Sequence, residues 1–184
     1  MSEEIEEYSS LGWSNNVNSS IGQGATGYNS VLSAKAKVGH PVHLETSYVH
    51  SGAVVGNNVL LSYVDIHDEV IPDGVVLHGL KQRDGRFVVR IYGVQDNPKE
   101  GKLFGKPLTD WGQKGPLWTA EIYPVCNTIV QGVKAALNLY AVVMGGGDRQ
   151  AWEQAEKKSL SSGFWDADPE AIIAWDRRMQ ELVH

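Results

Sequence analysis

The pattern of apolar and polar residues repeats at a short, nearly fixed interval between residues 21 and 77. An apolar residue followed by a turn residue occurs four times, with spacings of 17, 17 and 16, at Ile21-Gly22, Val38-Gly39, Val55-Gly56 and Ile71-Pro72. Within each repeat, apolar residues alternate with polar ones, which is the pattern of a half-buried β-strand. A repeat of this kind is typical of a solenoid, in which each unit buries its apolar face by stacking on the next.

We therefore predict a short, single-stranded parallel β-helix over residues 21–79, with serine and threonine hydroxyls hydrogen-bonded at its corners. The hexapeptide-like pattern favours a left-handed coil, although the spacing alone does not fix the hand. Residues 1–20 are acidic and then polar, and we expect them to form a lead-in that caps the first coil. Residues 80–115 are predicted to contain a β-hairpin that turns at Asp84-Gly85, followed by an irregular crossing segment rich in glycine and proline.

The last part of the chain, residues 116–184, is predicted to form a layer of about three helices. Helix starts are indicated at Asn127 or Thr128, at Asp148, and at Asp168, where proline follows the capping residue. We expect these helices to pack on a flat face of the coils. The fold class is therefore mainly β with an α-helical C-terminal part.

Histidines are concentrated in or beside the repeat, where five of the six lie: His40, His43, His50, His67 and His78. Many trimeric acyltransferases use a histidine base on a β-helix coil, so a catalytic role has to be considered. The histidines are assigned to different repeat registers, with His43 aligned to Leu60 and Val76 of the following coils. This placement predicts outward-facing, solvated side chains, and no catalytic or metal-binding residue is expected among them.

The composition argues against several classes of protein, among them nucleic-acid-binding, disulfide-bonded and membrane-spanning proteins. Apolar residues make up 42% of the 184-residue chain, as is ordinary for a soluble globular protein, and the net charge of -6 argues against a nucleic-acid-binding surface. The single cysteine, Cys126, excludes an internal disulfide and a cysteine-rich zinc site. The chain has neither an apolar run of roughly 20 residues nor a secretion signal. We expect a cytoplasmic protein that does not bind membranes.

Three segments carry a resemblance to a known family. They read Arg-Ile-Tyr-Gly-Val-Gln-Asp-Asn-Pro-Lys at residues 90–99, Leu-Phe-Gly-Lys-Pro at 103–107 and Leu-Trp-Thr-Ala-Glu-Ile-Tyr-Pro-Val at 117–125. With the hairpin before them and the tryptophan-bearing helices after them, they resemble the L-fucokinase/GDP-L-fucose pyrophosphorylase (fucose-1-phosphate guanylyltransferase) family. The resemblance extends from about residue 8 to the C-terminus.

The resemblance implies a role in the salvage of fucose to GDP-L-fucose. In that family one domain phosphorylates L-fucose with ATP, and another joins fucose-1-phosphate to GTP. A β-helix and a helical linker lie between them in the bifunctional members, and this chain is similar to that middle portion. The catalytic domains require glycine-rich phosphate loops, whereas the glycine cluster at residues 145–147 reads as a helix end. We expect no catalytic residue and no cofactor in this chain, with Mg²⁺ and GTP or ATP belonging to nucleotidyltransferase and kinase domains outside it.

The polar run between residues 90 and 99 supplies the candidate ligand-binding residues, which are Arg90, Tyr92, Asp96, Asn97 and Lys99. Arginine and lysine are natural phosphate partners, so this loop could contact the nucleotide or sugar phosphate of a neighbouring catalytic domain. The alternative is that Asp96-Asn97-Pro98 forms a turn and Arg90 fixes the hairpin. We favour the structural interpretation.

The sequence therefore predicts a scaffold that contacts other domains of a fucose-salvage enzyme or a second copy of itself. A self-standing hexapeptide-type acyltransferase is one alternative, although the few coils and long helical tail argue against it. A stand-alone binding protein derived from the family is the other.

Overall fold

A computed structural model of the chain describes residues 8–10 and 25–183. The chain divides into two compact units, Met1–Val75 together with Pro169–His184, and Val76–Asp168. We call them the coil unit and the hairpin unit. The predicted copy of the repeat at Ile21-Gly22 and most of the predicted lead-in lie outside the described residues.

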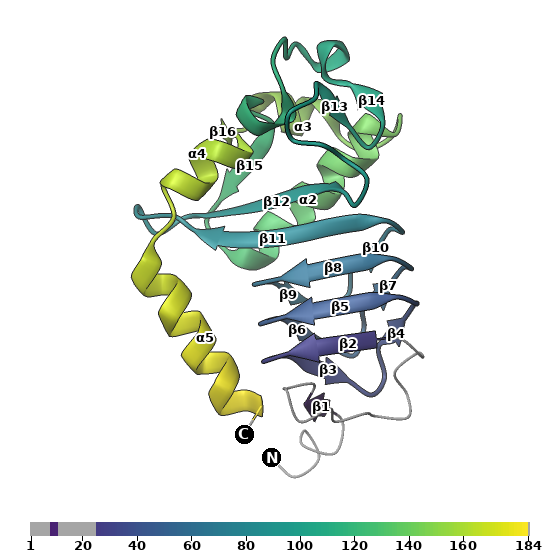
Figure 1. The fold of residues 1–184 in the computed structure, drawn as a ribbon, viewed down its shortest axis with the longest axis vertical. Coiled ribbons are helices and arrows are strands. Elements are labelled where there is room, and N and C mark those ends of the chain that lie inside the picture. Colours follow the sequence, from purple (N-terminus) through teal and green to yellow (C-terminus); the bar gives the residue numbers. More distant parts are fainter. Residues whose placement is uncertain (1–7, 11–24, 184) are drawn as a thin grey trace. The chain divides into compact units, whose positions relative to one another are not determined.

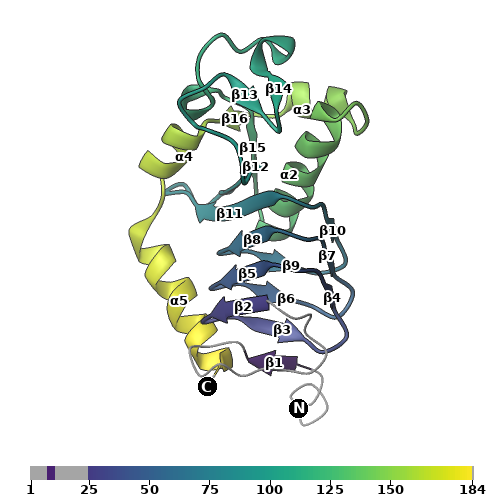
Figure 2. The ribbon, with the colours of Figure 1, turned by 45° about the vertical axis from the view of Figure 1, so that its right-hand side comes forward.

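The coil unit contains three described turns of a parallel β-solenoid, each built from three short strands (Figures 1 and 2). These strands are β2 (Ala25–Tyr28), β3 (Val31–Ser33) and β4 (Lys37–Val38); β5 (Val42–Glu45), β6 (Tyr48–Val49) and β7 (Val54–Val55); and β8 (Val59–Ser62), β9 (Asp65–Ile66) and β10 (Val70–Ile71). Strands of successive coils pair in parallel, so that β5 lies between β2 and β8, β6 between β3 and β9, and β7 between β4 and β10. A further strand, β1 (Tyr8–Ser10), pairs antiparallel with β3. The predicted parallel β-helix is confirmed.

The pairing register follows the spacing seen in the sequence. Val42 pairs with Val59, and Val54 pairs with Val70, so the two members of each pair are separated in sequence by one repeat. Leu44 and Leu61 pair in the same way, and both are almost completely buried. The repeat therefore brings equivalent apolar side chains into ladders inside the coils.

One corner of the coils has the same backbone conformation in each of the three described turns. Asn29, Thr46 and Tyr63 recur at the period of the repeat and have positive φ angles of 49°, 49° and 55°. Serines next to this corner connect the turns as predicted, since the Ser47 amide donates to Ser30 Oγ (3.0 Å) and the Val64 amide to Ser47 Oγ (3.3 Å).

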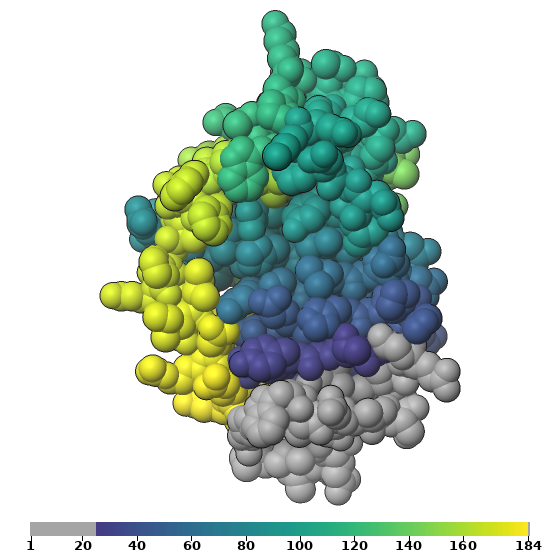
Figure 3. Space-filling model, viewed as in Figure 1, coloured from purple at the N-terminus to yellow at the C-terminus, as the bar shows by residue number. Residues whose placement is uncertain are grey.

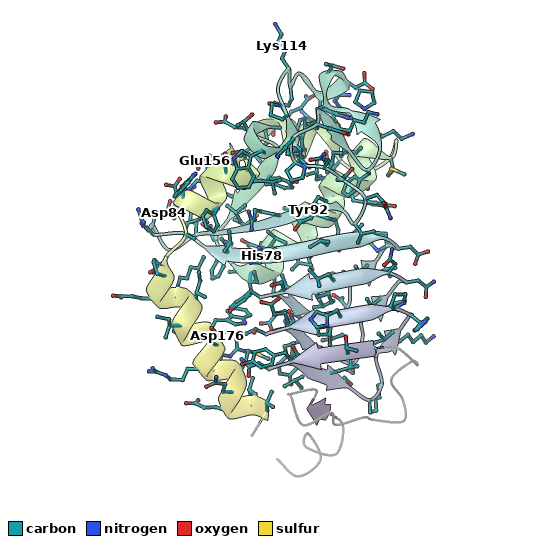
Figure 4. The ribbon with its side chains drawn as sticks, in the orientation of Figure 1. His78, Asp84, Tyr92, Lys114, Glu156 and Asp176 are labelled. Atoms are coloured by element: carbon teal, nitrogen blue, oxygen red, sulfur yellow. The ribbon has the colours of Figure 1, made fainter. Side chains whose placement is uncertain are left out.

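Helix α5 (Pro169–Val183) belongs to the coil unit and binds to this corner (Figure 3). Trp175 Nε1 donates to the Thr46 carbonyl (2.9 Å), and the Tyr63 hydroxyl donates to Asp176 Oδ1 (2.7 Å). Asn29 Nδ2 donates to the backbone carbonyl of Asp176 (3.1 Å), and Figure 4 labels Asp176 on the side of the helix that faces the coils. One helix thus joins the corners of all three described turns.

The hairpin unit is built on antiparallel strands. Its strands are β11 (Val75–Lys81), β12 (Phe87–Gly93), β13 (Lys102–Leu103), β14 (Lys106–Pro107), β15 (Tyr123–Cys126) and β16 (Lys157–Lys158). The predicted hairpin is formed by β11 and β12, and Gly85 in its turn has a φ of 89°. On the other side of β12, β15 and then β16 extend the sheet.

The helices predicted as one layer are divided between the two units. The hairpin unit contains α2 (Ile129–Val143), α3 (Arg149–Gln154) and α4 (Leu160–Trp165), with 3₁₀ turns η1 (Leu108–Trp111) and η2 (Leu117–Thr119) before them. Thr128 and Asp148 cap α2 and α3 as predicted, and α2 packs on β12 and β15. Within the described residues, no helix is long and apolar enough to cross a membrane.

Candidate functional site

Arg90 is the centre of the polar cluster in the hairpin unit. It lies on β12, and it is only 7% exposed. Its Nη1 donates to the Leu160 carbonyl (3.1 Å), and its Nη2 donates to His78 Nδ1 (2.5 Å) on the neighbouring strand β11. Burial lowers the pKa of Arg90 from its usual value, since the charged form loses its hydration. The guanidinium therefore connects both strands of the hairpin to the start of α4.

The contact with Arg90 determines the protonation state of His78. A guanidinium has only donors, so His78 Nδ1 must accept and cannot carry a proton. Burial and then the charge of Arg90 lower the pKa of His78 to about 4, which keeps the ring neutral at physiological pH. Sequence reasoning did not connect His78 with Arg90, because the pairing of the two residues depends on the hairpin register.

Tyr92 follows Arg90 by two positions on β12 and is half-buried. Alternate residues of a strand point to the same face, so Arg90 and Tyr92 share one face of the hairpin. Figure 4 labels Tyr92 on β12 and His78 on β11. On β15, the fully buried Tyr123 donates from its hydroxyl to the Ile91 carbonyl (2.7 Å), which fixes β15 against β12.

Asp96 organises the loop that follows β12. Its Oδ2 accepts from the Gly93 amide (2.6 Å) and from the Phe104 amide (2.9 Å). This carboxylate thus joins the end of β12 to the turn between β13 and β14. Such bonds stabilise a turn, and they leave less of the carboxylate available to a ligand.

Asn97 and Lys99 lie on the exposed part of this loop. Asn97 Oδ1 accepts from the Lys99 amide (3.0 Å), which is a local turn contact. The Trp118 amide donates to the Pro98 carbonyl (2.9 Å), so the loop is also attached to η2. Of the five predicted ligand-binding residues, Arg90 and Asp96 therefore bind to the protein itself, and Asn97 and Lys99 face solvent.

The sequence was compared with protein-family models, with curated proteins and with solved structures. The model described as the fucose pyrophosphorylase domain matches residues 1–128, more than two thirds of the 184-residue chain. The chain belongs to the fucose pyrophosphorylase family. The match confirms the resemblance to the fucokinase/GDP-fucose pyrophosphorylase family, whose role is fucose salvage. The comparisons with curated proteins and with solved structures returned no match.

We expected the histidines of the repeat to be outward-facing and solvated, but in this member of the fucose pyrophosphorylase family several of them contact other side chains. His78 is part-buried against Arg90, and His50 and His67 stack on each other with ring centroids 4.0 Å apart. These two were assigned to different registers, yet they are separated by one repeat and occupy equivalent positions in successive coils. That separation was the signal that could have identified the pair.

Replacing Asp96 tests whether the loop of this family member is built as a structural turn. Asp96→Ala removes the acceptor of two backbone amides, and we expect it to lower the free energy of unfolding by about 1–3 kcal/mol. Asn97→Ala is the matched control, since it removes one exposed turn contact and should cost less than about 1 kcal/mol. Urea unfolding at pH 7 measures both. Equal losses for the two variants would contradict the structural role of Asp96.

Proposed function

We propose that this chain is the non-catalytic β-helix and linker portion of a fucose-salvage enzyme that makes GDP-L-fucose from fucose-1-phosphate and GTP. It acts as a scaffold that spaces catalytic domains and contacts them or a second copy of the chain. Nucleotide binding, Mg²⁺ and, in bifunctional members, fucokinase activity belong to those other domains.

The observation that carries the proposal is the internal use of Arg90 and Asp96. A phosphate-binding arginine has to present its N–H groups to the ligand. Arg90 instead directs both Nη atoms at protein acceptors, and Asp96 binds two backbone amides. These polar groups thus support the shape of the hairpin and its loop.

The coil unit supports the same role. Its ladders of apolar side chains and the attachment of α5 to three successive corners make a stack of short strands held at both its core and its edge. A solenoid with such fixed neighbours is suited to hold other domains at a set spacing.

The purified chain is expected to release no pyrophosphate above background when it is mixed with GTP, fucose-1-phosphate and Mg²⁺. Saturation-transfer NMR with GTP, fucose-1-phosphate and GDP-fucose is expected to show no signal from any of them. A guanylyltransferase domain from another family member provides the positive control for turnover. In a pull-down, the same domain is expected to be retained by this chain.

Two results would overturn the proposal. Turnover by the chain alone would make it an enzyme, and a GDP-fucose signal that disappears in Lys99→Ala would make the loop after β12 a binding site. Gel filtration with acetyl-CoA tests the acyltransferase alternative, which requires a trimer that binds the cofactor.

A further inference from the structure

Two histidines and an aspartate come together on adjacent turns of the coil unit. Tyr48 pairs with Asp65 and Val49 with Ile66 in the parallel strands β6 and β9. His50 and His67 follow these strands directly, and the His50 amide donates to the Ile66 carbonyl (2.8 Å). The repeat thus places the two imidazoles in equivalent positions, with Asp65 beside them.

The rings of this group are held in place by stacking. The imidazoles of His50 and His67 are nearly parallel, with an interplanar angle of 11° and centroids 4.0 Å apart. The ring of Tyr48 stacks on the other face of His50, with centroids 3.9 Å apart. The Glu69 side chain accepts from the His67 amide (2.9 Å) and adds negative charge next to the group.

Each of the three residues offers a metal-ligating atom, and these atoms lie within 4.8 Å of one another. Asp65 is only 8% exposed, and among the residues that the structure describes its Oδ1 has no hydrogen-bond partner. This oxygen is 4.0 Å from His50 Nε2. A buried carboxylate oxygen without a donor is costly, and a bound cation would remove that cost.

We propose that His50, Asp65 and His67 bind a divalent transition-metal ion, with Zn²⁺ as the best match, and that the ion connects two neighbouring turns of the solenoid. Imidazole nitrogens select Zn²⁺ and related metals, whereas Mg²⁺ and Ca²⁺ require oxygen ligands. Two histidines and one carboxylate leave a fourth tetrahedral position for water. Ligand atoms around Zn²⁺ are roughly 3.4 Å apart, so the ligating atoms of these side chains need to move about 1 Å closer together to bind the ion. This inference is independent of the proposed scaffold function.

Arg178 on α5 is a cation that faces this site. Its Nη1 lies 3.9 Å from Asp65 Oδ2, and its side chain is 52% exposed. In the metal-free protein it partly balances the charge of Asp65. Because two cations repel each other, Arg178 opposes metal binding, and it has solvent into which it can move. Removing its charge should therefore strengthen metal binding.

The test is a titration of the EDTA-treated full chain with Zn²⁺, by calorimetry, and with Co²⁺, by visible absorption of the tetrahedral ion. We expect one ion per chain, a higher melting temperature with Zn²⁺, and no competition by Mg²⁺. His67→Asn and Asp65→Asn should each weaken Zn²⁺ binding at least about 100-fold, since loss of an outer-shell partner already costs roughly 10–100-fold. His43→Asn is the matched control, because this histidine is on β5 and contacts Thr26 instead (2.7 Å).

Arg178→Gln keeps the test informative if a ligand variant does not fold. It should bind Zn²⁺ several-fold more tightly than the unmodified chain, a gain that misfolding cannot produce. Circular dichroism in EDTA checks that each variant keeps the fold. The proposal is wrong if the unmodified chain binds no Zn²⁺ at millimolar concentration, or if His43→Asn loses binding as much as His67→Asn.

Discussion

Leu61→Ala is expected to lower the free energy of unfolding of the coil unit by about 3–5 kcal/mol, which is the upper part of the range for leucine-to-alanine changes in a well-packed core. Leu61 lies on β8 with no exposed surface, and it pairs with Leu44, which is 1% exposed. Removing its side chain leaves a cavity between coils whose backbones are fixed by parallel hydrogen bonds. The surrounding coils therefore have little freedom to close it.

Leu60→Ala is the matched control for this prediction. Leu60 precedes Leu61 on the same strand, is partly exposed on the opposite face, and pairs with His43. The substitution deletes the same atoms from the same strand. The expected loss in the free energy of unfolding is below about 1 kcal/mol, because the Leu60 side chain is already partly hydrated. Guanidinium unfolding followed by circular dichroism, at pH 7 with EDTA, compares the two. Equal losses would mean that Leu61 does not belong to an interior ladder.

The coils could be predicted because the spacing of the sequence repeat equals the pairing register of their strands. A shift by one repeat aligns Val42 with Val59 and Leu44 with Leu61, and each aligned pair is a paired position in the parallel sheet. The burial of alternate residues follows from the same period. Val54 pairs with Val70, which is a separation of 16 residues instead of 17. The same difference was visible in the sequence as the shorter last spacing, between Val55-Gly56 and Ile71-Pro72.

The segment after α3 could not be predicted in this way. Helical signals beginning at Asp148 suggest a helix that continues to about Leu160, but α3 ends at Gln154. Lys157 Nζ donates to the carbonyls of Trp152 (2.9 Å) and Ala155 (2.8 Å), and β16 pairs with β15 immediately afterwards. The partner strand β15 precedes both α2 and α3 in the sequence, so local signals around α3 do not reveal the pairing.

For the candidate site around Arg90, the sequence predicted which residues take part, at positions 90–99, but not the contacts that they make. The sequence identified Arg90 and Asp96 as polar groups on a hairpin and its loop, and it left their partners open. Those partners, His78 and the Phe104 amide, are set by the hairpin register and by a second small turn. The stacked histidines show the opposite case, since their spacing by one repeat was present in the sequence.

Lowering the pH from 6.5 to 4 is expected to reduce the free energy of unfolding of the hairpin unit by up to about 3 kcal/mol through His78 alone, because one pKa unit corresponds to about 1.4 kcal/mol. The folded pKa is about 4, whereas the unfolded chain has the ordinary value of 6.5. The stability from the neutral ring is complete above 6.5. This stability is lost as the pH falls, because the unfolded chain binds a proton at His78 that the folded chain does not bind. The loss levels off below pH 4.

The reason lies in the contact with Arg90, which donates to His78 Nδ1 and carries the charge that a protonated ring would face. His78→Asn places an amide oxygen near the position of Nδ1 and does not titrate. Urea unfolding of both proteins at several pH values between 4 and 7, with EDTA present, isolates the contribution of His78 as the difference between the two curves. All other groups are the same in both proteins, so their contributions cancel in the difference. Parallel curves would show that the ring takes up a proton as readily in the folded chain as in the unfolded chain, and that burial and Arg90 do not keep it neutral.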